Sequence, residues 1–204
     1  MTEWSEASIA SILQRDLFAR AHVVVDNCNW TGHECDLLVV TTNMQIIDVE
    51  IKISRSDMRA DAKKEKWWDR RFLGYGPEEV CEVNGHVRWI TRPPIHENTA
   101  RQWPPKVWKH YYAMPREIWT DAMLPQVASE RSGIVLVYVD DHGGHRYEVK
   151  RRATANVGAD KISEAQALGI ARLANLRMWN AYRDLSVAKN DVNYWRAKAQ
   201  EVAA

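Results

Sequence analysis

The chain has few cysteines and no long apolar run. Its 204 residues include three cysteines, an odd and scattered set that argues against a disulfide scaffold and favours reduced thiols in the cytoplasm. No apolar stretch approaches the roughly 20 residues of a membrane-spanning helix, and the opening letters MTEWSEAS are acidic rather than signal-like. We therefore expect a cytoplasmic protein that does not interact with membranes. A zinc site is not indicated, because no second ligand pair with suitable spacing accompanies Cys28, His33 and Cys35.

The chain also lacks a large net charge, since its formal charge is +1. The first 50 residues nevertheless carry eight acids and two bases, a charge of −6, which leaves +7 for the remainder. Such a separation is typical of a cation-binding surface beside a polyanion-binding one. It can also arise by chance, because solvated surfaces are charged in any case.

The length predicts one domain over residues 1–204, and the order of the expected helices and strands makes it an α/β domain. A helix capped by Thr2 and running to Ala19 is expected first, followed by the strands HVVVDN, ECDLLVVTT and QIIDVEIKIS. A charged helix then follows, from Ser54 to about Arg71. These elements predict a helix followed by a three-stranded meander and a second helix.

The second half of the chain contains an insertion and a helical end. Residues 73–108 are rich in Pro and Trp, and Asn84-Gly85 between two strand-like arms predicts a β-hairpin inside this insertion. The segments KHYYAMP, SGIVLVYVD and HRYEVKRRA predict three further strands. Residues 161–204 predict a C-terminal helical segment, with a break near Ser186 as one alternative.

One strand alternates without interruption between aliphatic and charged residues. Successive side chains of a strand point to opposite faces, so Asp48, Glu50 and Lys52 share one face. A half-solvated antiparallel strand explains this pattern. A strand that forms the floor of a metal site explains it too, and then Asp48 is better read as a solvent-facing or salt-bridged acid than as a ligand. On either interpretation the other face should be core, through Ile47, Val49, Ile51 and Ile53.

Three acids are expected to converge near this strand. A short connection makes the strand beginning at Asp36 an antiparallel neighbour of the one ending at Glu50, and Glu6 falls on the apolar stripe of the first helix. Clustered carboxylates repel one another unless a cation neutralises them, and oxygen-rich clusters suit Mg²⁺ or Mn²⁺. A lysine two residues beyond the metal-binding acid, here Lys52, can orient or deprotonate a metal-bound water.

These residues resemble a known family. Asp36 followed after thirteen residues by Glu50-Ile51-Lys52 is similar to the D…(D/E)-x-K signature of the PD-(D/E)XK nuclease superfamily. The stretches EIKISRSDMRAD, HYYAMP and GIVLVYVDDHGG resemble its MmcB-like DNA repair branch, over roughly residues 3–70 and 109–175. The resemblance implies an αβββαβ restriction-endonuclease-like core with a central mixed sheet flanked by helices.

The resemblance also implies roles for individual residues. Asp36, Glu50 and the Ile51 carbonyl would be metal ligands, and Lys52 the catalytic lysine. The superfamily also has an acid in its first helix, at a less strictly fixed position. Glu6 matches this acid, and Glu3, one turn earlier, is the other candidate. The chain departs from the pattern in three respects: Cys35 stands where the name-giving Pro would be, no Gln-x-x-x-Tyr follows the lysine, and the insertion at 73–108 has no family counterpart that we recognise.

The bases after this strand predict where DNA would lie. On a continuous helix Arg55, Arg59, Lys63 and Lys66 fall close to one stripe that could contact a phosphate backbone. The alternative is a solvated helix in which Asp57, Asp61 and Glu65 neutralise the charge of the stripe. We therefore expect a Mg²⁺- or Mn²⁺-dependent deoxyribonuclease of DNA repair, recombination or phage DNA metabolism. The rival is a non-catalytic or inhibitory nucleic-acid-binding protein with the same fold, and a homodimer is left open in both cases.

Overall fold

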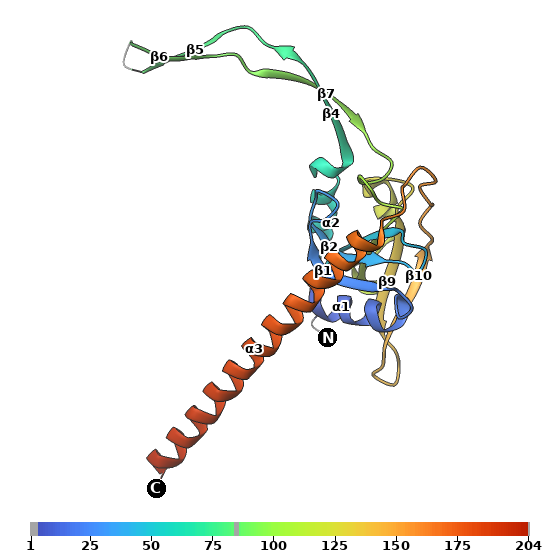
Figure 1. Ribbon diagram of the computed structural model, residues 1–204, viewed down its shortest axis with the longest axis vertical. Helices are drawn as coiled ribbons and strands as arrows, with labels where there is room; N and C mark the ends of the chain where they lie inside the picture. Colours follow the sequence, from blue (N-terminus) through green and yellow to red (C-terminus); the bar gives the residue numbers. More distant parts are fainter. Residues whose placement is uncertain (1–3, 84–85, 204) are drawn as a thin grey trace.

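A central six-stranded mixed sheet organises the molecule (Figure 1). The computed structural model describes residues 4–83 and 86–203. The strand order is β1-β2-β3-β8-β9-β10. β1, β2 and β3 are antiparallel neighbours, β8 runs parallel to both β3 and β9, and β10 is antiparallel to β9. The strand bounds are β1 Val23–Cys28, β2 Cys35–Val40, β3 Ile46–Ile51, β8 Lys109–Pro115, β9 Gly133–Val139 and β10 His145–Arg151.

One face of the sheet is covered by the first helix. α1 spans Glu6–Ile12 and continues as a π-helical turn, Leu13–Leu17, and its Ile9 and Leu13 pack on β2 and β3. Ser5, not Thr2, caps α1, because the Ser5 hydroxyl accepts a hydrogen bond from the Ser8 N–H over 3.2 Å. Thr2 and Glu3 lie outside the described residues.

The opposite face is covered by α2, by a short 3₁₀ segment and by the start of α3. α2 spans Arg55–Asp61, and α3 spans Glu164–Ala203. Met58 of α2 and Met123 pack against β8 and β9, while Ile170 of α3 packs against the β1–β3 end of the sheet. The remaining short helices are 3₁₀ turns, Glu65–Trp67, Arg116–Ile118 and Asp121–Gln126.

The expected burial of the alternating strand is correct for three of its four aliphatics. Ile47, Val49 and Ile51 are buried under α1. Ile53 is 45% exposed, so its assignment to the core was wrong. The physical reason is that β3 ends at Ile51 and the chain turns away from the sheet to Ser54, which caps α2 by accepting a hydrogen bond from the Asp57 N–H.

The expected long basic helix is much shorter than predicted. α2 ends at Asp61, and the chain forms the 3₁₀ turn at Glu65–Trp67 before entering strand β4 at Trp68. Lys66 and Trp67 are buried in this turn. Lys66 donates a hydrogen bond to Glu50 of β3 and Trp67 donates one to Asp61, so tertiary contacts override the local helix preference of the sequence.

The insertion forms a long two-stranded projection, called here the arm, residues 68–100. β4 (Trp68–Tyr75) pairs with β7 (Pro94–Ala100), and farther out β5 (Glu79–Val83) pairs with β6 (His86–Thr91). The predicted hairpin is thereby confirmed, while Asn84 and Gly85 themselves lie outside the described residues. Figure 1 shows the arm extending away from the sheet.

α3 is a second projection. At about 1.5 Å per residue, its 40 residues measure about 60 Å. The helix runs through Ser186 without interruption, so the alternative of a break there was wrong. Its first turns, as far as Arg177, contact the body mainly at β1, and Figure 1 shows the rest of the described helix extending away from the sheet. In the part of the chain that the structure describes, no helix combines the length and the apolarity needed to cross a membrane.

Candidate functional site

The charged side chains of β3 are buried, which rules out the half-solvated interpretation of this strand. Asp48, Glu50 and Lys52 are 1%, 0% and 2% exposed. Leu38 pairs with Asp48 in the β2–β3 register, so these side chains point to the face covered by α2 and the link that follows it. The sequence predicts Asp48 to be either a solvent-facing or a salt-bridged acid. Its burial excludes the first description, and its contact with Lys66 agrees with the second.

Both carboxylate oxygens of Glu50 accept hydrogen bonds from lysines. The Nζ atoms of Lys52 and Lys64 lie 2.7 and 2.8 Å from Oε2, and that of Lys66 lies 2.5 Å from Oε1. Lys66 is 1% exposed, whereas the Lys64 side chain is 44% exposed and reaches in from the surface. Burial acts to lower the pKa of Lys66, but the charges of Asp48 and Glu50 outweigh it and raise that pKa, so the ammonium stays charged.

Asp36 adjoins Glu50 across the β2–β3 pair. The Ile51 N–H donates to Asp36 Oδ2 over 2.7 Å, and Lys52 Nζ lies 3.8 Å from the same oxygen. Lys52 Nζ is also 2.7 Å from Glu50 Oε2, so a single ammonium group bridges the two carboxylates. Burial, and after it the charge of Glu50, raises the pKa of Asp36 to about 6.

Asp61 is a further acid of the site that the sequence interpretation treated only as a surface charge. Its Oδ2 accepts hydrogen bonds from the Tyr112 hydroxyl at 2.5 Å and from Trp67 Nε1 at 3.0 Å. Burial acts to raise the pKa of Asp61, but the Lys66 charge and the Tyr112 hydrogen bond bring it below its usual range. One signal was available: Asp61 follows Met58, a buried apolar residue, by three positions and so shares its helix face.

Asp48 and His110 form a buried pair beside these groups. They are register neighbours on β3 and β8, with His110 Nε2 at 3.9 Å from Asp48 Oδ2. Burial raises the pKa of Asp48 to about 6 and, together with the Lys66 charge, lowers that of His110 well below its usual range. Ser132 Oγ lies 2.9 Å from His110 Nδ1. Within the described residues, Asp48 Oδ1 and His110 Nε2 have no hydrogen-bond partner.

These groups are called the charged cluster. It contains four carboxylates and three lysines, a formal balance of −1 with His110 neutral. Its members come from β2, β3, the residue that directly follows β3, α2 and the α2–β4 link. They are Asp36, Asp48, Glu50, Asp61, Lys52, Lys64 and Lys66.

A small cavity adjoins Asp36 on its more open side. It has a volume of about 160 Å³ and is lined by Glu6, Asp26, Asp36 and Ile51, among others. Glu6 is exposed rather than on the inward stripe of α1, yet it still lines this cavity. The structure thus brings three of the four predicted metal-ligand positions to one cavity, while Glu50 lies within the charged cluster. Asp26, from β1, was not anticipated.

The predicted DNA-binding stripe does not exist as one surface. Arg55 and Arg59 are exposed on α2, where their Nε atoms donate to the Ile118 carbonyl and to Gln126. Lys66 is buried against Glu50, and Lys63 lies beyond the end of the helix. The prediction of one stripe was wrong because it assumed a continuous helix, whereas α2 ends at Asp61.

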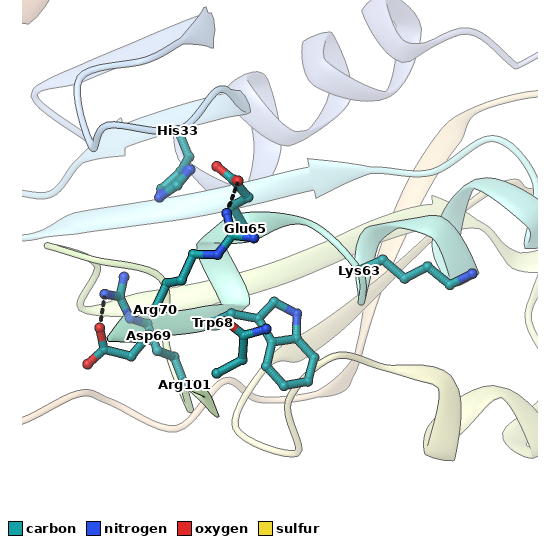
Figure 2. A pocket seen from close by; sticks show the side chains of 8 residues that line it. His33, Lys63, Glu65, Trp68, Asp69, Arg70 and Arg101 are labelled. Atoms are coloured by element: carbon teal, nitrogen blue, oxygen red, sulfur yellow. Dashed lines mark hydrogen bonds and ion pairs between the residues drawn. The ribbon is translucent and has the colours of Figure 1, made fainter. Parts of the chain in front are cut away.

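A larger and mostly basic cavity lies at the foot of the arm. Figure 2 shows its lining, which includes His33, Lys63, Trp68, Arg70 and Arg101. Its volume is about 640 Å³. Two acids partly balance the bases: Glu65 lies 3.6 Å from Arg70, and Asp69 lies 3.2 Å from Arg101. Trp68 is 40% exposed beside these charges.

Two observations bear on metal binding. Within residues 4–83 and 86–203, no three His, Cys, Asp or Glu side chains are arranged to hold one metal ion. The donor set nevertheless fits a hard cation in its chemistry: Asp36 and Glu50 already share one cation, the Lys52 ammonium, and the charged cluster retains a formal −1. A divalent ion would use the Asp36 and Glu50 carboxylates and would compete with Lys64 and Lys66 for Glu50.

Comparisons with known proteins give little beyond this geometry. No protein-family model matches the sequence, and no curated protein matches it. Among solved structures, the chain is similar to the SPO1766 protein of unknown function from Silicibacter pomeroyi. The similarity has a TM-score of 0.49 at 17% identity and covers 90% of this chain and 93% of that one.

Proposed function

We propose that this protein is a metal-dependent nuclease of the PD-(D/E)XK type that hydrolyses DNA phosphodiesters. The observation that carries the proposal is the convergence of Asp36, Glu50 and Lys52 from two neighbouring strands, with Lys52 Nζ 2.7 Å from Glu50 and 3.8 Å from Asp36. The order of α1, β1–β3, α2 and β8 supports an αβββαβ restriction-endonuclease-like core, with the arm inserted between α2 and β8.

The residues of the site have distinct tasks in this proposal. Asp36 and Glu50 would hold Mg²⁺ or Mn²⁺, which would supply a water activated for attack on a phosphodiester. Lys52 is placed to stabilise negative charge that develops on the phosphate. Lys64 has the most exposed side chain of the three lysines on Glu50, so its withdrawal is the simplest route by which Glu50 becomes available.

The arm foot is the surface best suited to hold the DNA. Lys63, Arg70 and Arg101 can contact phosphates, and the exposed part of Trp68 can stack on an unpaired base. This location replaces the stripe of Arg55, Arg59, Lys63 and Lys66 and keeps only Lys63 from it. The function would then belong to DNA repair, recombination or phage DNA metabolism.

A non-catalytic nucleic-acid-binding protein is the second candidate, and one observation favours it. Glu50 is fully buried, and lysines already occupy both of its oxygens. Its charge is therefore compensated without a metal, as in a structural ion network. Such a protein would bind DNA at the arm foot and leave it intact.

Cleavage and binding assays separate the two candidates. Purified protein is incubated with linear, circular, single-stranded and branched DNA in Mg²⁺, Mn²⁺ or EDTA. The nuclease proposal expects metal-dependent cleavage that falls by several orders of magnitude in Asp36→Asn, because a metal ligand is removed. Asp141→Asn is the matched control, since Asp141 is exposed in the turn between β9 and β10 and lies outside the charged cluster and the arm foot. Equal cleavage by Asp36→Asn, or cleavage in EDTA, would refute the proposal.

Binding without cleavage would favour the second candidate. In that case the double variant Arg70→Ala/Arg101→Ala should bind DNA more weakly and with a smaller salt dependence. The slope of log K against log salt should fall by about 0.9 for each phosphate that is no longer neutralised. Arg183→Ala, an exposed arginine far along α3, is the control.

A further inference from the structure

The free part of α3 exposes large apolar side chains. Arg177 is the last anchor to the body, through a 3.1 Å ion pair with Asp26 and a hydrogen bond to the Asn27 carbonyl. From Met178 onward every described side chain of the helix is exposed. Leu185 and Trp195 are 51% and 66% exposed. An isolated helix in water does not normally present such residues, so we expect a partner to cover this segment.

The apolar residues of this segment follow a seven-residue repeat. Positions a and d of the repeat are the two that face the partner helix in a coiled coil. With Met178 at position a, each a and d position from 171 to 199 is apolar, and no other reading frame of the helix has this property. The free part of the seam consists of Met178, Ala181, Leu185, Ala188, Val192, Trp195 and Ala199.

The charges beside this seam complement those of an identical helix. Positions g and e flank the seam, and in a parallel pair each g residue faces the e residue of the next heptad on the partner. Asp184 and Asp191 occupy g, and Lys189 and Arg196 occupy e. A second copy in parallel therefore pairs Asp184 with Lys189 and Asp191 with Arg196, twice each by symmetry. Asp184 is also near Arg183, at 3.7 Å, but both are over 70% exposed and the contact is weak.

An antiparallel pair would lack this complementarity. Reversing one helix brings e residues against e residues, which sets Lys189 and Arg196 against bases of the other copy. We propose that residues 178–199 of α3 form a parallel two-stranded coiled coil with the same segment of a second copy of this chain. Alanine at two of the d positions lets the helices approach closely, while Met178, Leu185 and Val192 supply the apolar layers between them.

Two complementary charge variants test the pairing. One carries Asp184→Lys and Asp191→Lys, and the other carries Lys189→Asp and Arg196→Asp. Each alone should dimerise about ten- to a hundredfold more weakly than the unaltered protein, because four attractive pairs become repulsive. An equimolar mixture should restore dimers, as mass and sedimentation measurements would show. Undiminished self-association of either variant, or no recovery on mixing, would overturn the proposal.

Orientation is tested independently by cross-linking. In a Cys81→Ser background, Ala188→Cys places identical thiols at the same level of a parallel pair, and a disulfide should form rapidly under mild oxidation. Asn190→Cys, at position f on the far side of the helix, is the matched control and should remain reduced. A monomeric unaltered protein at all concentrations, a trimer, or equal cross-linking of the two variants would contradict a parallel dimer.

Discussion

At the scale of residues, the charged cluster is governed by competition between burial and ion pairing. Glu50 is fully buried and is held by three ammonium groups, an arrangement in which removing one partner leaves an uncompensated charge. Asp36 is different, because its raised pKa of about 6 shows that ionisation costs free energy in the folded state. The cluster therefore combines a strongly held acid, Glu50, with two acids, Asp36 and Asp48, whose raised pKa values mean that their charge opposes folding.

The pH dependence of Asp36 follows from this difference. A carboxyl whose pKa rises on folding, here from 3.8 to about 6, binds its proton more tightly in the folded state. Its contribution to stability falls as pH rises through this range. Asp36→Asn should therefore be about 1–2 kcal/mol more stable than the unaltered protein at pH 7.5, after allowance for solvent screening, and should lose that advantage near pH 4. Urea unfolding in EDTA at both pH values measures this, and a difference independent of pH would contradict it.

Removing the Tyr112 hydroxyl tests how much its hydrogen bond to Asp61 contributes to the stability of the fold. Tyr112→Phe removes the donor 2.5 Å from the Asp61 carboxylate and leaves a buried acid with one partner fewer. We expect a loss of about 1–3 kcal/mol in the free energy of unfolding. Tyr182→Phe, an exposed tyrosine on α3, should change stability by no more than a few tenths of a kcal/mol. Equal effects of the two changes would show that the hydrogen bond does not stabilise the fold.

At the scale of elements, local sequence patterns predicted the strands better than what covers them. The alternation from Ile47 to Lys52 correctly predicts β3 and its two faces, because side-chain direction along a strand is a local property. The pattern cannot show that Lys64 and Lys66 fold back onto Glu50. A charged segment after α2 looks equally suited to a solvated helix, and only tertiary contacts with β3 and β8 decide otherwise.

The outer part of the arm, residues 76–93, should contribute little to the stability of the body. β5 and β6 form a sheet of their own, which is not part of the six-stranded sheet. Replacing residues 76–93 by an Asn-Gly turn between Tyr75 and Pro94 should therefore change the free energy of unfolding of the body by no more than about 0.5 kcal/mol. Denaturant unfolding followed by tryptophan fluorescence measures this. A loss several times larger than this would mean that the arm tip contributes to the core.

At the scale of the whole molecule, two projections, the arm and α3, extend from one body built around the six-stranded sheet. A compact chain of 204 residues has a radius of gyration of about 17 Å. The arm and α3 should raise the value well above this, as small-angle X-ray scattering can show. The measurement is best made on Leu185→Lys, because a charge in the α3 seam would prevent the proposed pairing of two copies. A radius close to that of a compact chain would indicate that one of the projections folds back onto the body.

The parallel pairing of β3 with β8 also has a consequence for folding kinetics. The two strands are adjacent in space but distant in the sequence, since β3 ends at Ile51 and β8 begins at Lys109. The arm is a local hairpin that brings Trp68 beside Ala100, and its formation shortens the loop that remains to be closed by roughly half. Loop-closure entropy varies as the logarithm of length, so early formation of the arm would lower the cost of pairing β3 with β8 by about 0.7 kcal/mol. The arm would then act as a folding nucleus for the sheet from which it projects, whatever it binds in the native protein.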